Sequence, residues 1–478
     1  MKMNKKAALQ QQEVIKKLSD IITGFYTTHG RDNFIEYLPP KDLSQKIDLI
    51  SVEKNYDWDV VFAWVEKYLK YSVKTDHPGF VNRMWTGANL PAIVGEIVTA
   101  ITNTSACTYE SAPVSTLMEK YMLDQMLDLA GFSNGVGQMT TGSSNANMIA
   151  MMAARNISCK SVKRVGLFDS NELYAFVNAD AHYSMDKAAN ILGIGTKHLI
   201  KVPQKSNGGM NTEALQEQLT SITASGGLPF FVGATAGTTV RGAYDSIPDL
   251  LELKKRHNFW LHVDGAWGGA VIVNDRLRDK FLRGIEEVDS FTMDFHKMFG
   301  TALICNVLLM NRRENIFRDL CSVGDTSYIF RQSEKEDDFN LGAQSLQCGR
   351  RVDSLKWFLD WKFYGKTGFA ERIEKYYALC EYAEHYVETA PELEMVVPRE
   401  SFNICFRYKA PESIVNEFNL ALRTSLYQSG ISLVGYAYIN NNATLRLLIC
   451  NSQFTKSDVA DFFNCLISTG NKLMKERI

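Results

Sequence analysis

The chain has 478 residues, of which 45% are hydrophobic and 22% charged, with a formal net charge of −2. This length allows two or three domains, and the balanced charge argues against nucleic acid or an anionic membrane surface as a partner. No apolar run reaches the roughly 18 residues that a membrane-spanning helix needs, and the basic N-terminus is not followed by the apolar segment of a signal peptide. Nine cysteines without a CxxC pair indicate reduced thiols, so we expect a cytoplasmic protein.

The first 75 residues predict helices that lie outside the main domain. Apolar side chains recur at helical spacing from Val14 to Phe25 and again from Val60 to Tyr71. Helices without a neighbouring sheet bury their apolar face on another domain or on another subunit. We expect a partner subunit here.

A Gly- and Pro-containing loop from His77 to Gly87 follows, and it contains Arg83 close to Trp85. Arginine in a loop is often only a solvated surface residue. The alternative is a binding site for an acid group, because a guanidinium matches the geometry of a carboxylate with two parallel donors.

Residues Thr140 to Asn147 (TTGSSNAN) precede a strongly helix-forming run that starts at Met148. Small hydroxyl residues at a helix start surround an anion with backbone N–H groups and side-chain donors, which suits a phosphate. The alternative is ordinary N-capping of the helix, which is the commoner role of such residues.

From residue 164 onward the chain alternates between apolar runs and amphipathic stretches. The apolar runs are 173–177, 199–202, 230–234, 259–263 and 291–293, and the stretches between them include 181–192, 212–222 and 247–257. Such alternation of strands and helices indicates a mainly parallel sheet covered by helices on both faces. The sequence therefore predicts an α/β domain.

Reactive or polar side chains follow several of these predicted strands. His182 comes after the first strand, Thr235 follows the third, Asp264 ends the fourth, and Lys297 follows the fifth. The carboxyl ends of parallel strands meet at one edge of a sheet, where ligands of open α/β sheets bind. An acid to hold a pyridinium nitrogen and a lysine to form a Schiff base are what pyridoxal phosphate chemistry requires.

Residues 321–345 lose periodicity and gain charge, which is typical of a mobile lid and also of a disordered connection. Tyr328 lies near the start of this stretch. Beyond it, helical periodicity from 351 to 388 is followed by elements of an α+β domain. These are strand-like runs at 403–407, 435–439 and 443–450, and helices at 415–428 and 456–474. Arg446 lies inside an apolar strand, where a charge needs a partner or a ligand.

Six motifs, in this order, carry a resemblance to a known family: KYSVKTDHPGFVNRMWTG, NTSACTYESAPV, GATAGTTVRGAYDSI, LHVDGAWGG, HKM and QCGRRVD. From about residue 70 to the C-terminus, the chain resembles the group II pyridoxal phosphate-dependent amino acid decarboxylases, most of all their glutamate and cysteine sulfinate branch. The resemblance implies an α/β enzyme of fold type I. Its large domain, residues 76–345, would hold a mainly parallel seven-stranded sheet. An N-terminal helical segment (1–75) and a small C-terminal α+β domain (346–478) would flank it.

The resemblance also implies a cofactor, with no metal ion, and the residues that hold it. Lys297 would bind pyridoxal 5′-phosphate as a Schiff base, and Asp264 would pair with its ring nitrogen. The other implied contacts are His182 and Ala266 on the two faces of the ring, Ser143, Ser144 and His296 at the phosphate, and Thr235 near the ring hydroxyl.

Arg446 matches the arginine that binds a substrate carboxylate in this family, and Tyr328 matches a loop tyrosine that reaches the active site of the neighbouring subunit. A homodimer with active sites at the subunit interface is therefore implied. Loss of CO2 leaves a carbanion at Cα that an acid must protonate, and a tyrosine hydroxyl on a closing lid can do so. We expect Lys297, His182 and Tyr328 to be the catalytic residues.

Three departures from the family pattern lie at or near the expected site. Arg83 stands where glutamate decarboxylases have a glutamine that touches the distal group of the substrate. An arginine there favours an acidic amino acid, namely glutamate, aspartate, cysteine sulfinate or cysteate. Asp294 stands where asparagine is common, which adds an acid near the expected phosphate contact, and Phe295 stands where the family usually has proline or a small residue. The alternatives are a decarboxylase of a non-acidic amino acid, an aminotransferase or amine-forming oxidase, and a scaffold without turnover.

Overall fold

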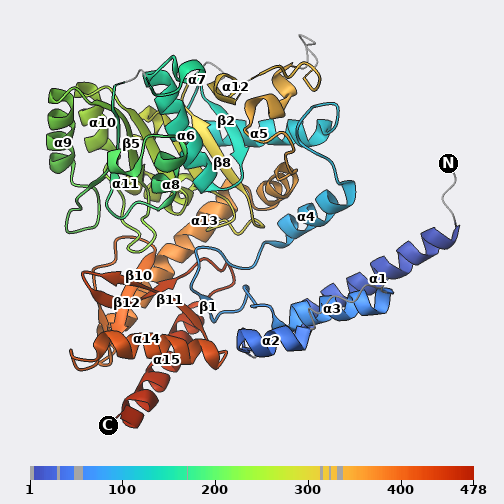
Figure 1. Ribbon diagram of the computed structural model, residues 1–478. Helices are drawn as coiled ribbons and strands as arrows, with labels where there is room; N and C mark the ends of the chain where they lie inside the picture. The colour runs from blue at the N-terminus through green and yellow to red at the C-terminus, as the bar shows by residue number, and fades with distance from the viewer. Residues whose placement is uncertain are drawn as a thin grey trace.

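The computed structural model describes residues 5–28, 33–47, 57–168, 171–312, 316–321, 324–330 and 337–477. Two β-sheets with their covering helices form two lobes, and the long helix α13 (Ser354–Thr389) runs from one lobe to the other (Figure 1). Gly365 breaks the helical geometry inside α13 with φ 64°, a value that favours glycine, so the helix is kinked there.

The larger sheet has seven strands in the order β2-β8-β7-β6-β5-β3-β4. Their bounds are β2 Val136–Thr140, β3 Leu173–Asn178, β4 Leu199–Val202, β5 Leu228–Thr235, β6 Trp260–Gly265, β7 Ser290–Asp294 and β8 Asn306–Met310. Neighbouring strands from β7 to β4 are parallel, whereas β8 is antiparallel to both β7 and β2. The predicted fold class, a mainly parallel seven-stranded sheet, is confirmed.

Helices cover both faces of this sheet, as the alternating pattern predicts. One face packs on α6 (Ser143–Ser158) and α8 (Ser184–Ile191), and the other packs on α5 (Pro113–Ala130), α9 (Thr212–Ala224) and α10 (Ile247–Arg256). The central strands β5, β6 and β7 are buried along almost their whole length. Strands buried on both faces read as continuous apolar runs, which is why the sequence revealed them.

The alternation of side chains along β6 decides which of them reach the α6 face. Trp260 packs in the cluster that contains α6, whereas Leu261 and Val263 pack in the cluster that contains α5. Successive side chains of a strand point to opposite faces of a sheet. His262 and Asp264 therefore share the α6 face with Trp260.

The smaller sheet has five strands in the order β1-β11-β12-β10-β9. Its elements are β1 Phe80–Val81, β9 Leu393–Met395, β10 Asn403–Tyr408, β11 Leu433–Ile439, β12 Asn442–Leu448, and the helices α14 Val415–Gln428 and α15 Lys456–Arg477. The predicted strands and helices of this region are confirmed, with ends that differ by a few residues. Arg446 lies in β12, opposite Cys405 on one side and Gly435 on the other.

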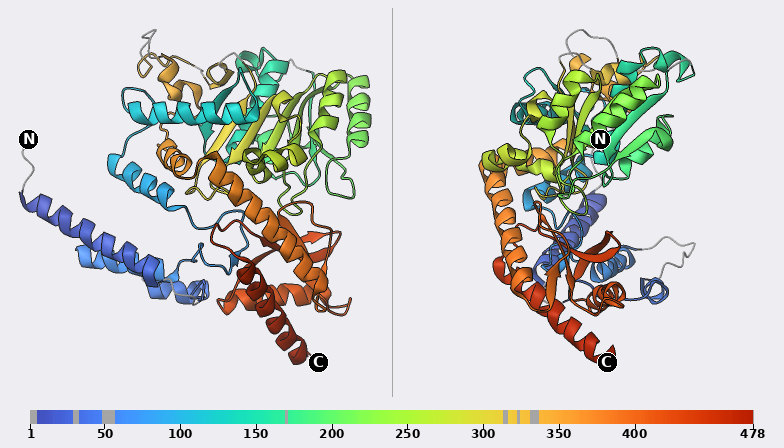
Figure 2. Two further views of the ribbon diagram at one scale, coloured as in Figure 1. Left: turned by 180° about the vertical axis from the view of Figure 1, so that it is seen from behind. Right: turned by 90° about the vertical axis from the view of Figure 1, so that its left-hand side faces the viewer.

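The N-terminal helices α1 (Lys5–Thr28), α2 (Pro40–Ile47) and α3 (Trp58–Tyr71) extend away from both sheets, and α1 packs along α3 (Figure 2). The remaining described elements are α4 Leu90–Thr102, α7 Val162–Val165, α11 Asp275–Phe281, α12 Ile316–Cys321 and the 3-10 turns 196–198, 268–273, 285–287, 337–339 and 341–344. Among the described helices, none is both long and apolar enough to cross a bilayer.

Candidate active site

The carboxyl ends of β5, β6 and β7 bring several of the predicted site residues to one edge of the larger sheet. Thr235 ends β5 and stands in register with Asp264 on β6, and Asp264 stands in register with Thr292 on β7. Asp294 is the last residue of β7, and Lys297 lies in the turn that follows it. Parallel strands end at the same edge, so these side chains are neighbours although they are far apart in the chain.

Lys297 is paired with a buried acid. Its Nζ lies 3.0 Å from Oδ2 of Asp294, and Oδ1 of Asp294 accepts a hydrogen bond of 2.7 Å from Nδ2 of Asn306. Burial alone would raise the pKa of Asp294, but the Lys297 ammonium, the nearby His296 and these hydrogen bonds hold it below its usual value. Asp294 is therefore an ionised counter-ion of Lys297. The asparagine that is common at this position in the family could not supply this negative charge.

His296 and Phe295, which flank this pair in sequence, point in different directions. Nδ1 of His296 faces the main chain of Cys305, and its Nε2 lies 3.7 Å from Oδ2 of Asp294. Burial lowers the pKa of His296, which favours a neutral ring. Phe295 is completely buried and packs on Phe299, with ring centroids 4.9 Å apart. The departure at position 295, from proline or a small residue to phenylalanine, therefore concerns core packing rather than the site.

The start of α6 is shaped to receive an anion. Gly142 precedes it with φ 112° and ψ 160°, a combination that only glycine adopts readily, and no side chain caps the first turn. The Ser143 side chain is buried and its Oγ accepts a hydrogen bond of 2.9 Å from Asn306, the same amide that reaches Asp294. Uncapped amides of a helix start, together with the hydroxyls of Ser143 and Ser144, are the donors that a phosphate requires.

Asp264 is held by two donors and shares its surroundings with Lys297 and His182. Its Oδ2 accepts a hydrogen bond of 2.8 Å from Asn147, and its Oδ1 accepts one of 3.1 Å from the Ala266 amide. Burial lowers the pKa of His182, the Asp264 carboxylate opposes this shift, and the Lys297 ammonium adds to it. The structure therefore brings an acid, an amine and an imidazole together.

The Thr235 hydroxyl is buried and has no hydrogen-bond partner in the described structure. A buried hydroxyl without a partner costs free energy, so such a group marks a position where a ligand can supply the missing bond. The arrangement of an amine, an acid, an anion cradle and a spare hydroxyl fits an aromatic aldehyde phosphate such as pyridoxal 5′-phosphate.

A second group of predicted residues lies where β12 faces the loop after β5. The Arg446 guanidinium donates to the main-chain oxygen of Thr239 and, at 3.2 Å, to that of Asn82, while its Nε is buried without a partner. Burial lowers the pKa of Arg446, and the nearby positive charge of Arg83 lowers it further. The Arg83 side chain is exposed, so the two predicted arginines form a cationic pair open to solvent on one side.

Tyr328 is the one predicted site residue that the structure does not bring to this region. Its side chain is 77% exposed, within the described segment 324–330. The predicted loop 321–345 lies partly outside the described residues, because 322–323 and 331–336 are not among them. The lid and the role of Tyr328 stay predictions.

Two asparagines that organise the site were not predicted from the sequence. Asn147 and Asn306 are fully buried, and they bond the two acids of the site, Asp264 and Asp294 respectively. Asn147 lies one helical turn after Ser143 on α6, so the spacing of four residues was an available signal. Asn306 gave no such signal, because it lies at the start of β8, a strand that was not predicted.

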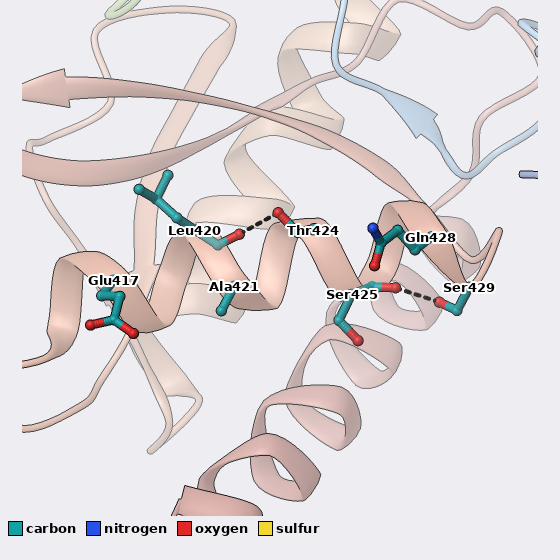
Figure 3. Close-up of a pocket in the computed structure, with 7 residues that line it drawn as sticks. All are labelled: Glu417, Leu420, Ala421, Thr424, Ser425, Gln428 and Ser429. Carbon is teal, nitrogen blue, oxygen red and sulfur yellow. Dashed lines mark hydrogen bonds between the residues drawn. The ribbon is translucent and has the colours of Figure 1, made fainter. Parts of the chain in front are cut away.

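A hollow on the surface of the small lobe has a different lining. Figure 3 shows this hollow along α14, lined by Glu417, Leu420, Ala421, Thr424, Ser425, Gln428 and Ser429. Its hydroxyls at Thr424 and Ser429 donate back to carbonyl oxygens of the same helix at 2.8 and 2.7 Å. Within the described residues, no group of three acids, histidines or cysteines is arranged to hold a metal ion.

Comparison with known proteins decides the family. The model of the pyridoxal-dependent decarboxylase conserved domain matches residues 40–409. The chain belongs to this family. It is 34% identical over 404 residues to the acidic amino acid decarboxylase GADL1 of Mus musculus, covering 84% of this chain and 72% of the relative. It is 33% identical over 451 residues to the cysteine sulfinic acid decarboxylase of Homo sapiens, covering 92% of this chain and 91% of the relative.

A solved structure agrees with this assignment over nearly the whole fold. The crystal structure of mouse CSAD in its apo form superposes with a TM-score of 0.92 at 29% sequence identity, covering 97% of this chain and 99% of that one. The chain is therefore a pyridoxal phosphate-dependent amino acid decarboxylase, and pyridoxal 5′-phosphate is its cofactor. The predicted family, enzyme class and cofactor are confirmed.

Proposed function

We propose that this decarboxylase acts on an acidic L-amino acid, such as glutamate, aspartate, cysteine sulfinate or cysteate, and releases the corresponding amine and CO2. The observation that carries the proposal is the pair Arg83 and Arg446, two cations close enough to affect each other with no acidic side chain bonded to either among the described residues. Two adjacent cations repel each other unless an anion lies between them. A substrate with a carboxylate on the backbone and a second acid on the side chain would supply both partners.

The cofactor-binding roles follow from the chemistry of each group. Lys297 would carry the cofactor covalently, and Asp264 would pair with its ring nitrogen. We assign His182 and Ala266 to the two ring faces, Ser143, Ser144 and His296 to the phosphate, and Thr235 to the ring hydroxyl. Bound pyridoxal phosphate supplies an electron sink for the bonding pair that CO2 leaves behind. The neighbouring Asp264 carboxylate favours the protonated state of the ring nitrogen that this sink requires.

The protein's own contribution to the reaction is positioning and proton handling. Arg446 and Arg83 would hold the two acid groups of the substrate, so that the bond from Cα to the departing carboxylate stands perpendicular to the cofactor ring. Asp294 would hold a proton at Lys297 Nζ through its 3.0 Å contact. The hydroxyl of Tyr328 would then deliver a proton to Cα, from a lid that closes over the site of the neighbouring subunit.

We also propose that the enzyme is a cytoplasmic homodimer, in which residues 1–75 pack on the partner, 76–345 bind the cofactor and 346–478 form the small domain. One side of α4 supports the dimer, because its apolar residues Leu90, Val94, Ile97, Val98 and Ile101 are 66, 47, 45, 39 and 76% exposed. All nine cysteines are free, which suits a reducing compartment.

A substrate panel tests the proposal. Purified enzyme with added pyridoxal phosphate is assayed for CO2 across acidic and neutral amino acids, alongside keto-acid and peroxide production. We expect rapid CO2 release from acidic substrates and only slow release from neutral ones. Arg83→Gln should raise KM for acidic substrates about 10- to 100-fold with little change in kcat, because it removes a charge that binds ground state and transition state alike.

The matched control is Arg283→Gln, an arginine with 70% side-chain exposure that pairs with Asp279. It should leave KM unchanged. An equal loss on acidic and neutral substrates in Arg83→Gln would refute the acidic preference. Keto-acid or peroxide as the main product would instead favour an aminotransferase or an amine-forming oxidase.

A further inference from the structure

Four buried polar side chains form a continuous hydrogen-bonded chain that ends on Asp264. Nε1 of Trp260 donates to Oγ of Ser290 at 2.7 Å, and Oγ of Ser290 lies 2.8 Å from Nδ1 of His262. Nε2 of His262 lies 2.9 Å from Oδ1 of Asn147, and Nδ2 of Asn147 donates to Oδ2 of Asp264 at 2.8 Å. Ser290, His262 and Asn147 are fully buried, and Trp260 is 5% exposed.

The strand geometry explains why these residues line up. Trp260, His262 and Asp264 alternate along β6, so all three face α6, which supplies Asn147. Ser290 stands in register with His262 on the adjacent strand β7. None of these hydrogen bonds therefore depends on a loop.

The direction of each hydrogen bond is fixed from both ends of the chain. An ionised Asp264 only accepts hydrogen bonds, so Asn147 must present its NH2 group there, and it presents the same group to Oγ of Ser184 at 2.9 Å. The amide oxygen of Asn147 then faces His262, so Nε2 of that ring must donate.

His262 has only one proton to give. Burial lowers its pKa to about 4, although Asp264 and the Ser290 main chain oppose the shift. With the single proton on Nε2, Nδ1 must accept, and the donor is the Ser290 hydroxyl. Ser290 Oγ in turn accepts from Trp260, whose indole N–H can only donate. Every donor in the chain therefore points toward Asp264.

We propose that Trp260, Ser290, His262 and Asn147 are positioning residues, a one-way donor chain that fixes the orientation of the Asp264 carboxylate toward the cofactor ring nitrogen. The proposal rests on the proposed role of Asp264. Each donor in the chain sets the position of the next, so the Asn147 amide is held at one carboxylate oxygen and opposes rotation of the Asp264 carboxylate. The indole N–H of Trp260 can only donate, so the Ser290 hydroxyl accepts from Trp260 and donates to His262. The reversed pattern, in which the amide oxygen of Asn147 would face Asp264, is therefore excluded.

The test compares Trp260→Phe, Ser290→Ala, His262→Gln and Asn147→Ala in the holoenzyme reconstituted with pyridoxal phosphate labelled with 15N in the ring. Trp357→Phe is the matched control, because Trp357 is also buried but its indole N–H has no partner in the described structure. The readouts are the 15N chemical shift of the ring nitrogen against pH and the rate of cofactor release. Asp264→Asn is the reference for complete loss of the acid.

We expect the wild type and Trp357→Phe to keep the protonated 15N shift from about pH 6 to about pH 9, and the chain variants to lose it within that range. The rate of cofactor release should increase more the nearer the substituted residue lies to Asp264. We expect a rate roughly 3-fold above the wild type in Trp260→Phe and roughly 30-fold above it in Asn147→Ala. Even if the larger substitutions impair folding, Trp260→Phe keeps an aromatic ring and removes only the donor.

Two negative results have different meanings. If Asp264→Asn changes the 15N shift but none of the four chain variants does, the donor chain is refuted and the proposed role of Asp264 stands. If Asp264→Asn itself leaves the shift unchanged, the role of Asp264 and the donor chain both fail.

Discussion

The two ends of the candidate site are built in opposite ways. At the cofactor end each buried charge has an internal partner, since Asp294 pairs with Lys297 and Asp264 accepts hydrogen bonds from Asn147 and the main chain. At the arginine end, Arg446 is buried beside another cation, with only carbonyl oxygens as partners among the described residues. A buried charge without a counter-ion costs stability. The protein therefore organises the cofactor end by itself, whereas the arginine end is completed by an anion.

Removing the amine at the cofactor end should give the largest effect. Lys297→Ala is expected to reduce CO2 release roughly 10⁴-fold or more, since it removes the group that attaches the cofactor. It should also lower the stability of the cofactor-free protein, because it leaves the carboxylate of Asp294, with its side chain 3% exposed, without its ion pair. Product assays and thermal unfolding measure the two effects.

Lys187→Ala is the control for this experiment. Lys187 lies near His182, but its ammonium stacks on the Tyr183 ring, 4.4 Å from the ring centroid. It should change neither activity nor stability by more than a small factor. A Lys297→Ala protein that kept the visible absorbance of attached cofactor would contradict the assignment of Lys297.

Removing the charge at the arginine end should separate activity from stability. Arg446→Met is expected to lower kcat/KM about 100- to 1,000-fold, because a buried cation that binds a carboxylate contributes about 3 to 4 kcal/mol. The stability of the substrate-free protein should nevertheless hold or rise, because the apolar side chain fills the same space without an unpaired charge.

Arg446→Lys makes this contrast sharper. A lysine keeps the charge but lacks the planar pair of donors, so it should recover only part of the lost kcat/KM. If Arg446→Met instead destabilised the protein as strongly as Lys297→Ala does, the arginine would be a structural residue, and the contrast between the two ends would be wrong.

The sequence predicted the central strands and the reactive residues at their ends, because fully buried parallel strands form continuous apolar runs. It did not predict β2, whose residues Val136–Thr140 include a glycine and two polar side chains, or β8, which follows the lysine turn closely. The strand order and the antiparallel direction of β8 depend on pairing between distant segments, which no local pattern encodes.

The same limit applies within the site. Lys297 and Asp264 were predicted because each ends or follows a buried strand. The partners Asn147 and Asn306 were missed because a buried asparagine has no compositional signal apart from its hydrogen bonds. The proximity of Arg83 and Arg446 arises because β1 pairs with β11 in the smaller sheet, which brings the loop containing Arg83 next to β12.

The neutral histidine of the donor chain should make the cofactor end sensitive to acid. Burial lowers the pKa of His262 to about 4, whereas an unfolded histidine titrates near 6.5. Between these values the unfolded chain binds more protons than the folded one, so stability falls as pH falls, by about 3 kcal/mol in total. His262→Gln should abolish this contribution, which unfolding measurements from pH 7 to about pH 4 would reveal.

Asp245 works in the opposite direction, since burial raises its pKa to about 6 despite three hydrogen bonds to its carboxylate. There the folded chain binds more protons, and stability falls as pH rises through the same range. Both groups therefore contribute to the pH dependence of the free energy of unfolding. The contribution of His262 is obtained by subtracting the His262→Gln profile from the wild-type profile. A difference that does not vary with pH would mean that His262 is not held neutral.

The smallest expected effect comes from Thr235, whose buried hydroxyl has no hydrogen-bond partner among the described residues. Thr235→Val should stabilise the cofactor-free protein by about 1 kcal/mol, because it removes a buried hydroxyl that has no partner. It should weaken cofactor binding about 5- to 10-fold if that hydroxyl meets the ring hydroxyl. Thr116→Val is the matched control, since Thr116 on α5 also has a buried, unpartnered hydroxyl. We expect the two variants to gain the same stability and only Thr235→Val to lose affinity for the cofactor. That result would show that the Thr235 hydroxyl, like the two arginines, is left without a protein partner because a ligand supplies one.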